Sequence, residues 1–317
     1  MSLAMVFPGQ GSQSVGMLAE LAAEHPVVRA TFDRASATLK YDLWAVVAHG
    51  PSDRLNATAC TQPAMLAAGF ATWQVWRQAG GATPAWVSGH SLGEFTALVC
   101  AGALDFEAAV ELVAARGELM QSAVPLGTGA MAAVLGLEDA DVEAACAEAA
   151  QGSVVEAVNY NSPAQVVIAG ETAAVNRAIE AAKARGAKRA VVLPVSVPSH
   201  SSLMREAAAK LGERLAQVRF QPPKIPYLSA VDSVVHENPD DLRANLVKQL
   251  ASPVRWSQTV RVLVTLGATT LIECGPGKVL TSLNRRIERR PEIQCAALED
   301  SASLAAALLL SVGATKS

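Results

Sequence analysis

Short continuous apolar runs alternate along the chain with longer segments in which apolar residues recur at helical spacing. Runs such as residues 3–7 and 85–88 predict buried strands. Residues 15–24, 26–39 and 63–78 predict helices, the last of them opened by Thr61-Gln62-Pro63 with the proline in its first turn. The alternation resumes late in the chain, where a predicted helix at 257–266 leads into a predicted strand at 270–273. This order is typical of an α/β fold with a mostly parallel sheet.

The pattern changes near residue 129. Strand-like and helix-like segments follow in the order βαββαβ at residues 130–137, 140–150, 154–159, 165–169, 173–185 and 190–195. This order predicts a ferredoxin-like small domain at 127–197, inserted into a large domain of residues 1–126 and 198–317. A second lobe beside the first would create a cleft, and ligands bind in clefts.

The apolar run at 85–88 ends in Gly89-His90-Ser91-Leu92-Gly93, a Gly-x-Ser-x-Gly sequence that opens a predicted helix. We interpret it as a nucleophile elbow, in which the glycines permit a tight turn and Ser91 stands at the apex. The helix beginning at Leu92 would point free N–H groups at negative charge developing beside the serine. The motif predicts an α/β-hydrolase-like core, although the same five letters also arise by chance.

A glycine-rich loop, Pro8-Gly9-Gln10-Gly11-Ser12-Gln13, follows the first predicted strand. It has neither the Gly-Lys-Ser/Thr of a P-loop nor the Gly-x-Gly-x-x-Gly spacing of a dinucleotide site. Because open parallel sheets bind ligands at the carboxyl ends of their strands, Gln10 is placed at a binding edge. A plain strand-to-helix turn explains the loop equally well.

Arg116 lies on a helix predicted at 106–121. Its neighbours three and four positions away are apolar: Leu112, Val113, Leu119 and Met120. The guanidinium therefore projects from the apolar face, where an arginine needs an anion. That anion is either an internal Asp or Glu, or a substrate carboxylate held by the bidentate fork of arginine. The second case would tune an enzyme to an acidic acyl group.

His200 follows the last predicted strand of the small domain, where the chain returns to the large domain. A lone histidine is by default structural, but an elbow serine needs a base, and His200 is the best placed of the five histidines. His25, His49 and His236 fall in helix ends, loops or turns, and His90 should point away from its neighbour Ser91. We therefore expect His200 to serve Ser91.

The composition restricts the partners. A formal net charge of -3 gives no general attraction to nucleic acid or to anionic membranes. The N-terminus lacks a signal-peptide pattern, and the late apolar stretch at 304–312 is too short to span a bilayer. Five scattered cysteines without a Cys-x-x-Cys pair favour neither a disulfide framework nor a zinc site. We expect no metal and a cytoplasmic location.

With these residues identified, the sequence resembles the malonyl-CoA:acyl carrier protein transacylases of bacterial type II fatty acid synthesis over essentially its whole length. The matching stretches are Phe7-Pro8-Gly9-Gln10-Gly11-Ser12-Gln13, Gly89-His90-Ser91-Leu92-Gly93-Glu94, Arg116-Gly117 with Met120-Gln121, Val158-Asn159-Tyr160-Asn161-Ser162-Pro163, Val197-Pro198-Ser199-His200, Gln249-Leu250 with Pro253-Val254-Arg255-Trp256, and Gly275-Pro276-Gly277. Each stretch alone is weak, whereas their common order and spacing are specific. Val-Pro-Ser-His differs from the tetrapeptides of modular polyketide synthases, which favours a standalone enzyme.

The resemblance implies a role for each matched residue. Ser91 would become malonylated, His200 would act as general base and then general acid, and Arg116 would bind the malonyl carboxylate. Gln10 and Leu92 would supply the two backbone N–H groups of the oxyanion hole. Gln249 would orient the histidine through its main-chain carbonyl, and Asn159 would bind substrate.

The implied reaction is a ping-pong transfer of malonyl from malonyl-CoA to the phosphopantetheine thiol of acyl carrier protein, without a cofactor. We expect a monomer, although the sequence itself does not determine the oligomeric state. The carrier could serve fatty acid, polyketide or malonate decarboxylase systems. A serine hydrolase is the enzymatic rival and would want an acid for its histidine. A non-catalytic carrier-docking subunit is the other rival. Two basic clusters, residues 184–189 and 285–290, are expected to be solvated faces or, as a weaker hypothesis, to receive the acidic carrier or nucleotide phosphates.

Overall fold

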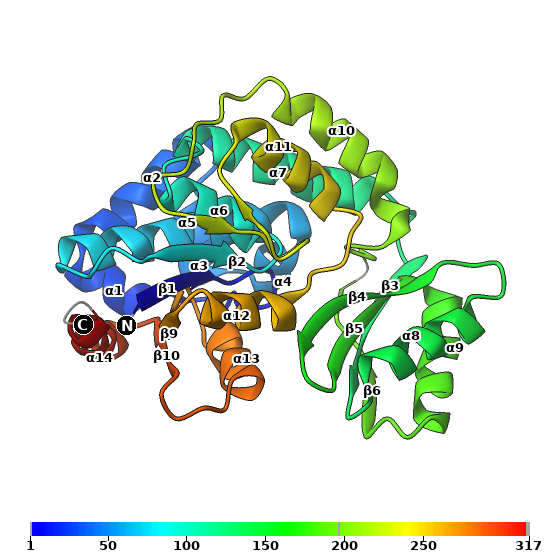
Figure 1. Ribbon diagram of the computed structural model, residues 1–317. Helices are drawn as coiled ribbons and strands as arrows, with labels where there is room; N and C mark the ends of the chain where they lie inside the picture. The colour runs from blue at the N-terminus through cyan, green and yellow to red at the C-terminus, as the bar shows by residue number, and fades with distance from the viewer. Residues whose placement is uncertain (1, 196, 315–317) are drawn as a thin grey trace.

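The computed structural model describes residues 2–195 and 197–314, and Ser196, in the predicted connection between domains, lies outside them. The described chain forms two separate sheets (Figure 1). The larger sheet has the strand order β10 (Gln294–Leu298), β9 (Ala268–Cys274), β1 (Ser2–Phe7), β2 (Trp86–Gly89), β7 (Tyr227–Leu228) and β8 (Val235–His236). Its neighbouring strands are parallel except β7 and β8, so the predicted mostly parallel sheet is confirmed.

Helices cover both faces of this sheet (Figure 1). One core contains Leu3, Met5 and Phe7 of β1 and is closed by α1 (Ala19–Glu24), α2 (Pro26–Leu39), α3 (Leu43–His49), α4 (Ser52–Asn56), α5 (Thr58–Gln78), α6 (Gly93–Cys100), α7 (Phe106–Ser122), α10 (Arg205–Leu215), α11 (Pro239–Gln249) and α14 (Ser301–Ala314). The opposite core contains Ala4 and Val6 under α12 (Trp256–Thr265) and α13 (Val279–Ile287). Burial on both faces explains why β1 is a continuous apolar run.

The smaller sheet lies to one side of the larger one (Figure 1). Its elements are β3 (Gly129–Leu135), α8 (Asp139–Ala150), β4 (Val155–Ser162), β5 (Gln165–Glu171), α9 (Thr172–Ala184) and β6 (Arg189–Val192). The antiparallel strand order β4-β5-β3-β6 is the predicted ferredoxin-like arrangement. Helices α8 and α9 cover one face, and the other face carries a small apolar cluster that includes Met131 and Leu193. The domain boundaries at 127 and 197 stay a prediction.

Two predicted helix starts were wrong. The helix expected at 15–24 begins only at Ala19, because Gly16 and Leu18 adopt left-handed backbone with φ of 85° and 60°. The helix expected to begin at Pro63 begins at Thr58, with the proline inside it. There, α7 approaches so closely that a Cβ at Gly117 would lie 2.7 Å from Ala59 Cα. This packing supports helical turns that local sequence preference alone would not form.

Candidate active site

Ser91 stands at the turn between β2 and α6, at the carboxyl edge of the large sheet, with a left-handed φ of 52°. A Cβ at Gly89 would lie 2.0 Å from the carbonyl carbon of Gly93, and a Cβ at Gly93 would lie 2.0 Å from the carbonyl oxygen of Phe7. Neither position admits a side chain, since the turn is folded back on itself and packed onto the end of β1. The predicted elbow is therefore present in the fold.

His200 contacts Ser91 across 109 positions of sequence, with Nε2 at 2.7 Å from Oγ. Its Nδ1 lies 2.9 Å from the main-chain carbonyl oxygen of Gln249. Because a carbonyl only accepts, Nδ1 carries the proton and Nε2 is left to accept from the serine hydroxyl. Burial, and then the nearby charge of Arg116, lower the pKa of His200 to about 3. The imidazole is thus neutral and available as a base at neutral pH.

The side chain of Arg116 extends from α7 to the Ser91 hydroxyl, and the residue is only 1% exposed. Its Nη2 donates to Gln249 Oε1 at 2.9 Å and to Ser91 Oγ at 3.2 Å, and its Nη1 donates to Gln62 Oε1 at 2.9 Å. Burial lowers the pKa of Arg116 to about 10 and the charge of nearby Glu94 acts in the opposite direction, so the group stays charged at neutral pH.

The partners of Arg116 are neutral oxygens. In the described part of the chain no ion pair joins it to a carboxylate, and its buried Nε has no hydrogen-bond partner. The internal Asp or Glu that could have neutralised it is therefore not in contact. A buried guanidinium without a direct ion-pair partner, beside a serine hydroxyl, is suited to bind an anionic group of a ligand.

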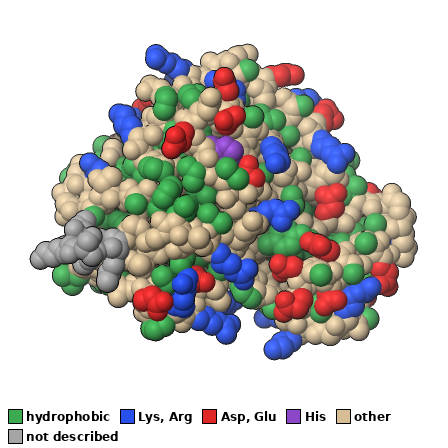
Figure 2. Space-filling view, viewed as in Figure 1, with side chains coloured by type: hydrophobic (Ala, Val, Ile, Leu, Met, Phe, Trp, Pro, Cys, Tyr) green, Lys and Arg blue, Asp and Glu red, His purple; other side chains and the backbone are tan. Residues whose placement is uncertain are grey.

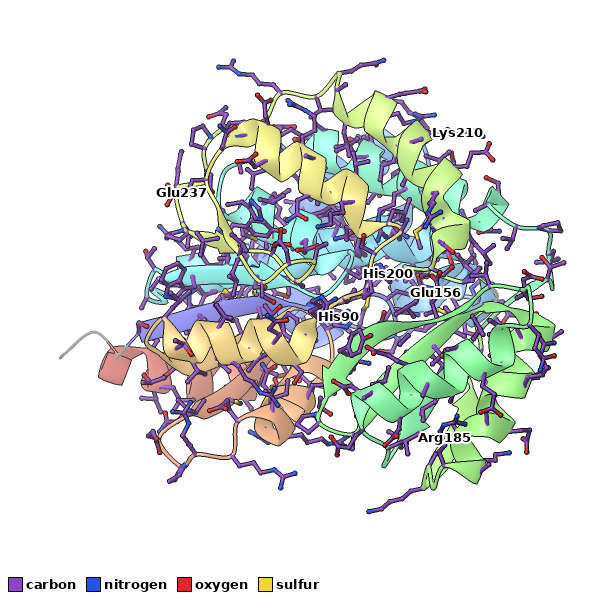
Figure 3. The ribbon with its side chains drawn as sticks, turned by 45° about the vertical axis from the view of Figure 1, so that its right-hand side comes forward. His90, Glu156, Arg185, His200, Lys210 and Glu237 are labelled. Atoms are coloured by element: carbon purple, nitrogen blue, oxygen red, sulfur yellow. The ribbon has the colours of Figure 1, made fainter. Side chains whose placement is uncertain are left out.

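A cavity of about 490 Å³ lies in front of the serine. It is lined by all the predicted site residues except the buried Gln249, namely Gln10, Ser91, Leu92, Arg116, Asn159 and His200. Met131 and Leu193 from the helix-free side of the small sheet also line it. The cavity thus lies between the two sheets, and Figure 3 shows His90 and His200 at that junction.

The other predicted residues contribute free polar groups. Among the described hydrogen bonds, the backbone N–H groups of Gln10 and Leu92 have no acceptor in the protein. The buried Oδ1 of Asn159 likewise has no partner among the described residues. His90 directs Nε2 to Asn161 Oδ1 at 2.8 Å rather than to the serine, as expected. Gln10, Leu92 and Asn159 thus line the cavity and carry polar atoms that no described protein group satisfies.

Sequence reasoning missed two buried residues that hold the site together. Gln62 was read only as part of a helix start, yet its side chain accepts from Arg116. Glu94, the residue after the elbow, is fully buried and accepts hydrogen bonds from Tyr227 Oη at 2.6 Å and from the Ala230 N–H at 2.7 Å. Its position directly after Gly93 was the available signal, because a carboxylate inside an apolar helix needs a polar partner.

Other predicted features lie at the surface. The clusters at 184–189 and 285–290 consist mainly of exposed residues. On the face shown in Figure 2, Lys and Arg side chains are interspersed with Asp and Glu, so no single basic patch stands out there.

Among the described residues, no group of three or more His, Cys, Asp or Glu could hold a metal ion.

Known proteins share this whole arrangement. The sequence profile of the acyl transferase domain family matches residues 4–299. A malonyl CoA-acyl carrier protein transacylase from Escherichia coli (strain K12) is 54% identical over 307 residues, which cover 97% of this chain and 99% of that protein. The chain belongs to the malonyl CoA-acyl carrier protein transacylase family.

Solved structures of such transacylases have the same fold. An acyl carrier protein S-malonyltransferase from Vibrio cholerae superposes with a TM-score of 0.94 at 54% identity, covering 96% of this chain and 99% of that one. A malonyl-transacylase in complex with its type II PKS acyl-carrier protein superposes with a TM-score of 0.96 at 52% identity, covering 98% and 100%. The likeness to these transacylases extends over both sheets and thus over the cavity between them.

Proposed function

We propose that this acyltransferase moves malonyl from malonyl-CoA to the phosphopantetheine thiol of acyl carrier protein through a malonyl ester on Ser91. The observation that carries this proposal is the buried guanidinium of Arg116, which contacts neutral groups and lies 3.2 Å from the serine Oγ. A malonyl group esterified there would keep its free carboxylate within reach of the guanidinium. The names of the relatives and the neighbour bound to a carrier protein support the same reaction.

In the first half-reaction, His200 Nε2 takes the hydroxyl proton as Ser91 Oγ attacks the thioester carbonyl carbon. The resulting oxyanion would accept hydrogen bonds from the backbone N–H groups of Gln10 and Leu92, because both residues line the cavity and neither N–H has a described acceptor. As the intermediate collapses, the carbon–sulfur bond breaks, and the CoA sulfur takes the proton back from His200. The product of this half-reaction is the malonyl ester of the serine.

In the second half-reaction, the carrier thiol gives its proton to His200 and attacks the ester carbonyl carbon. The carbon–oxygen bond to Ser91 then breaks, and the serine oxygen recovers the proton. Because the histidine is oriented by the carbonyl of Gln249 and not by a carboxylate, the pair differs from a hydrolase triad. This difference favours the transferase over the serine hydrolase.

Arg116 would supply the selectivity for malonyl. An acetyl group would leave the guanidinium buried and unneutralised, which costs about 2 to 5 kcal/mol relative to a paired charge. The malonyl carboxylate would also offset the positive charge that disfavours protonation of His200. Binding the correct acyl group would thus ease the proton transfer that starts the reaction. Asn159, which lines the cavity, would contribute to substrate binding.

We further propose a monomeric enzyme that needs no cofactor, works in the cytoplasm and supplies fatty acid synthesis. All five cysteines are free, which fits a reducing compartment. Among the described residues, no helix is both long and apolar enough to cross a membrane. Carrier proteins of fatty acid and polyketide systems, compared in one transfer assay, would test the choice of pathway.

The deciding experiment is incubation of the protein with malonyl-CoA in the absence of carrier. We expect intact-mass and peptide analysis to find a lasting malonyl ester on Ser91, which holo-carrier then discharges to malonyl-carrier. Ser91→Ala should abolish both signals. Rapid release of free malonate without a carrier would instead identify a hydrolase, and unchanged transfer by Ser91→Ala would revive the non-catalytic subunit.

A further inference from the structure

Gln249 is the buried residue that joins the three reactive side chains. Its main-chain oxygen accepts from His200, its Oε1 accepts from Arg116 at 2.9 Å, and its Nε2 donates to the carbonyl oxygen of Ser91 at 2.8 Å. Because the two ends of an amide differ, only one of the two flipped orientations makes both side-chain bonds. The opposite orientation would turn an NH₂ group toward the guanidinium.

Glu94 contacts the same amide from behind. Its Oε2 accepts from Gln249 Nε2, and its Oε1 accepts from Tyr227 Oη at 2.6 Å and from the Ala230 N–H at 2.7 Å. Glu94, Tyr227 and Gln249 are all buried, so no solvent competes for these bonds. A carboxylate that accepts on both oxygens requires the NH₂ end of Gln249 to face it.

We propose, on the basis of the function proposed above, that Glu94 is a positioning residue for malonyl selectivity. It holds the Gln249 amide in the orientation that presents Oε1 to Arg116, and thereby fixes the guanidinium for the substrate carboxylate. Glu94 acts through Gln249 and does not touch the serine or the histidine. Its effect is therefore on recognition of the acyl carboxylate, while the nucleophile and its base are left intact.

An isosteric substitution separates these effects. In Glu94→Gln, the new amide would direct its oxygen to the two donors Tyr227 and Ala230, which leaves its NH₂ group facing Gln249. The Gln249 amide, whose Nε2 also donates to the Ser91 carbonyl oxygen, would then either face that NH₂ group with its own or flip and turn its NH₂ toward Arg116. Either change disturbs the acceptor that fixes the guanidinium. The main-chain bond from Gln249 to His200 does not depend on the orientation of the side-chain amide, so the histidine base stays aligned with Ser91.

The test compares two rates on the same protein. One is the loading of Ser91 by malonyl-CoA, and the other is its inactivation by a neutral sulfonyl fluoride, which needs Ser91 and His200 but no carboxylate site. For Glu94→Gln we expect malonyl loading to fall by about tenfold or more and inactivation to change by less than about threefold. An unchanged ratio of the two rates, whether both fall or neither does, would overturn the proposal.

Two further variants serve as controls. Glu273→Gln replaces another buried carboxylate, which accepts from the N–H groups of Leu280 and Thr281 at 3.0 and 2.7 Å, and should leave the ratio unchanged. Tyr227→Phe removes one of the hydrogen-bond donors to Glu94 and should lower the ratio of malonyl loading to inactivation by about twofold or more. If Glu94→Gln does not fold, Tyr227→Phe decides, and an unchanged ratio there overturns the proposal. A wild-type protein that forms no malonyl ester would reject the proposed function itself.

Discussion

Arg116 donates from Nη2 to the Oγ of Ser91 at 3.2 Å, although Arg116 lies in α7 and Ser91 in the turn between β2 and α6. The guanidinium therefore lies close to the place where the carbonyl carbon of an acyl group would bind Ser91. A three-carbon diacid is short enough to bridge the guanidinium and Ser91, as the proposed malonyl ester requires.

Removal of the guanidinium should reverse the acyl preference. For Arg116→Ala we expect malonyl transfer to fall by about 100-fold or more, because the carboxylate loses its partner, while acetyl transfer is retained or increased. Initial rates with malonyl-CoA and acetyl-CoA and holo-carrier measure both. The matched control is Arg177→Ala, whose side chain binds the carbonyls of Ala149 and Ala150 in the small sheet's helices. Unchanged malonyl transfer by Arg116→Ala would refute this role.

An internal carboxylate should occupy the arginine in place of the substrate. Gln62 Oε1 lies 2.9 Å from Arg116 Nη1, so Gln62→Glu places an anion of nearly the same shape against the guanidinium. We expect kcat/KM for malonyl-CoA to fall by about tenfold to 100-fold and acetyl-CoA to be affected less. Steady-state kinetics with both substrates provide the measurement. Equal losses with both acyl groups would show that Gln62 acts on folding and not on charge.

The pH dependence should reflect the environment of His200. Its pKa is lowered to about 3 by burial and by the charge of Arg116, so the neutral base persists as pH falls below the ordinary value of the group, 6.5. Inactivation by a neutral sulfonyl fluoride should therefore be nearly constant between about pH 5 and pH 7. In Arg116→Ala the second cause is gone, so the acid limb should move to higher pH. A wild-type acid limb centred near the ordinary histidine pKa would contradict this assignment.

The elbow should tolerate no side chain at its last glycine. A Cβ at Gly93 would lie 2.0 Å from the Phe7 carbonyl, so Gly93→Ala must displace α6 or β1. We expect a loss of about 3 kcal/mol or more in the free energy of unfolding, together with loss of malonyl loading. Gly152 has φ of 89° and open space around it, so Gly152→Ala should cost only about 1 kcal/mol and keep activity. Urea unfolding and malonyl loading of both variants provide the comparison.

The hydrophobic pattern of a single segment was sufficient to predict an element whose structure depends mainly on that segment. The helix Pro26–Leu39 was predicted at its observed bounds, since proline favours its first turn and its apolar residues recur at helical spacing. The elbow and the βαββαβ order were predicted for similar reasons. The start of α5 was wrong because contact with α7 at Gly117, which is remote in sequence, decides it.

The site residues likewise divide into those recognisable from local sequence and those defined by contacts remote in sequence. Ser91 and Arg116 were found because their residue type conflicts with their local pattern, a polar apex in one case and a charge on an apolar face in the other. The supporting contacts could not be found this way. Gln62 and Glu94 act through partners 54 and 155 positions away, Arg116 and Gln249, and no periodicity in the chain encodes such pairs. The resemblance pointed to the roles of Gln10, Leu92, Gln249 and Asn159, which remain predictions.

The acceptor that aligns His200 is a peptide oxygen at the last residue of α11. Every amino acid brings the same oxygen, so side-chain replacement at position 249 cannot delete it, and scanning mutagenesis would underestimate its importance. The orientation of the His200 imidazole therefore depends on the position of the carboxyl end of α11. Displacement of α11 by a distant insertion or a bound molecule would misalign the base while leaving every reactive side chain in place.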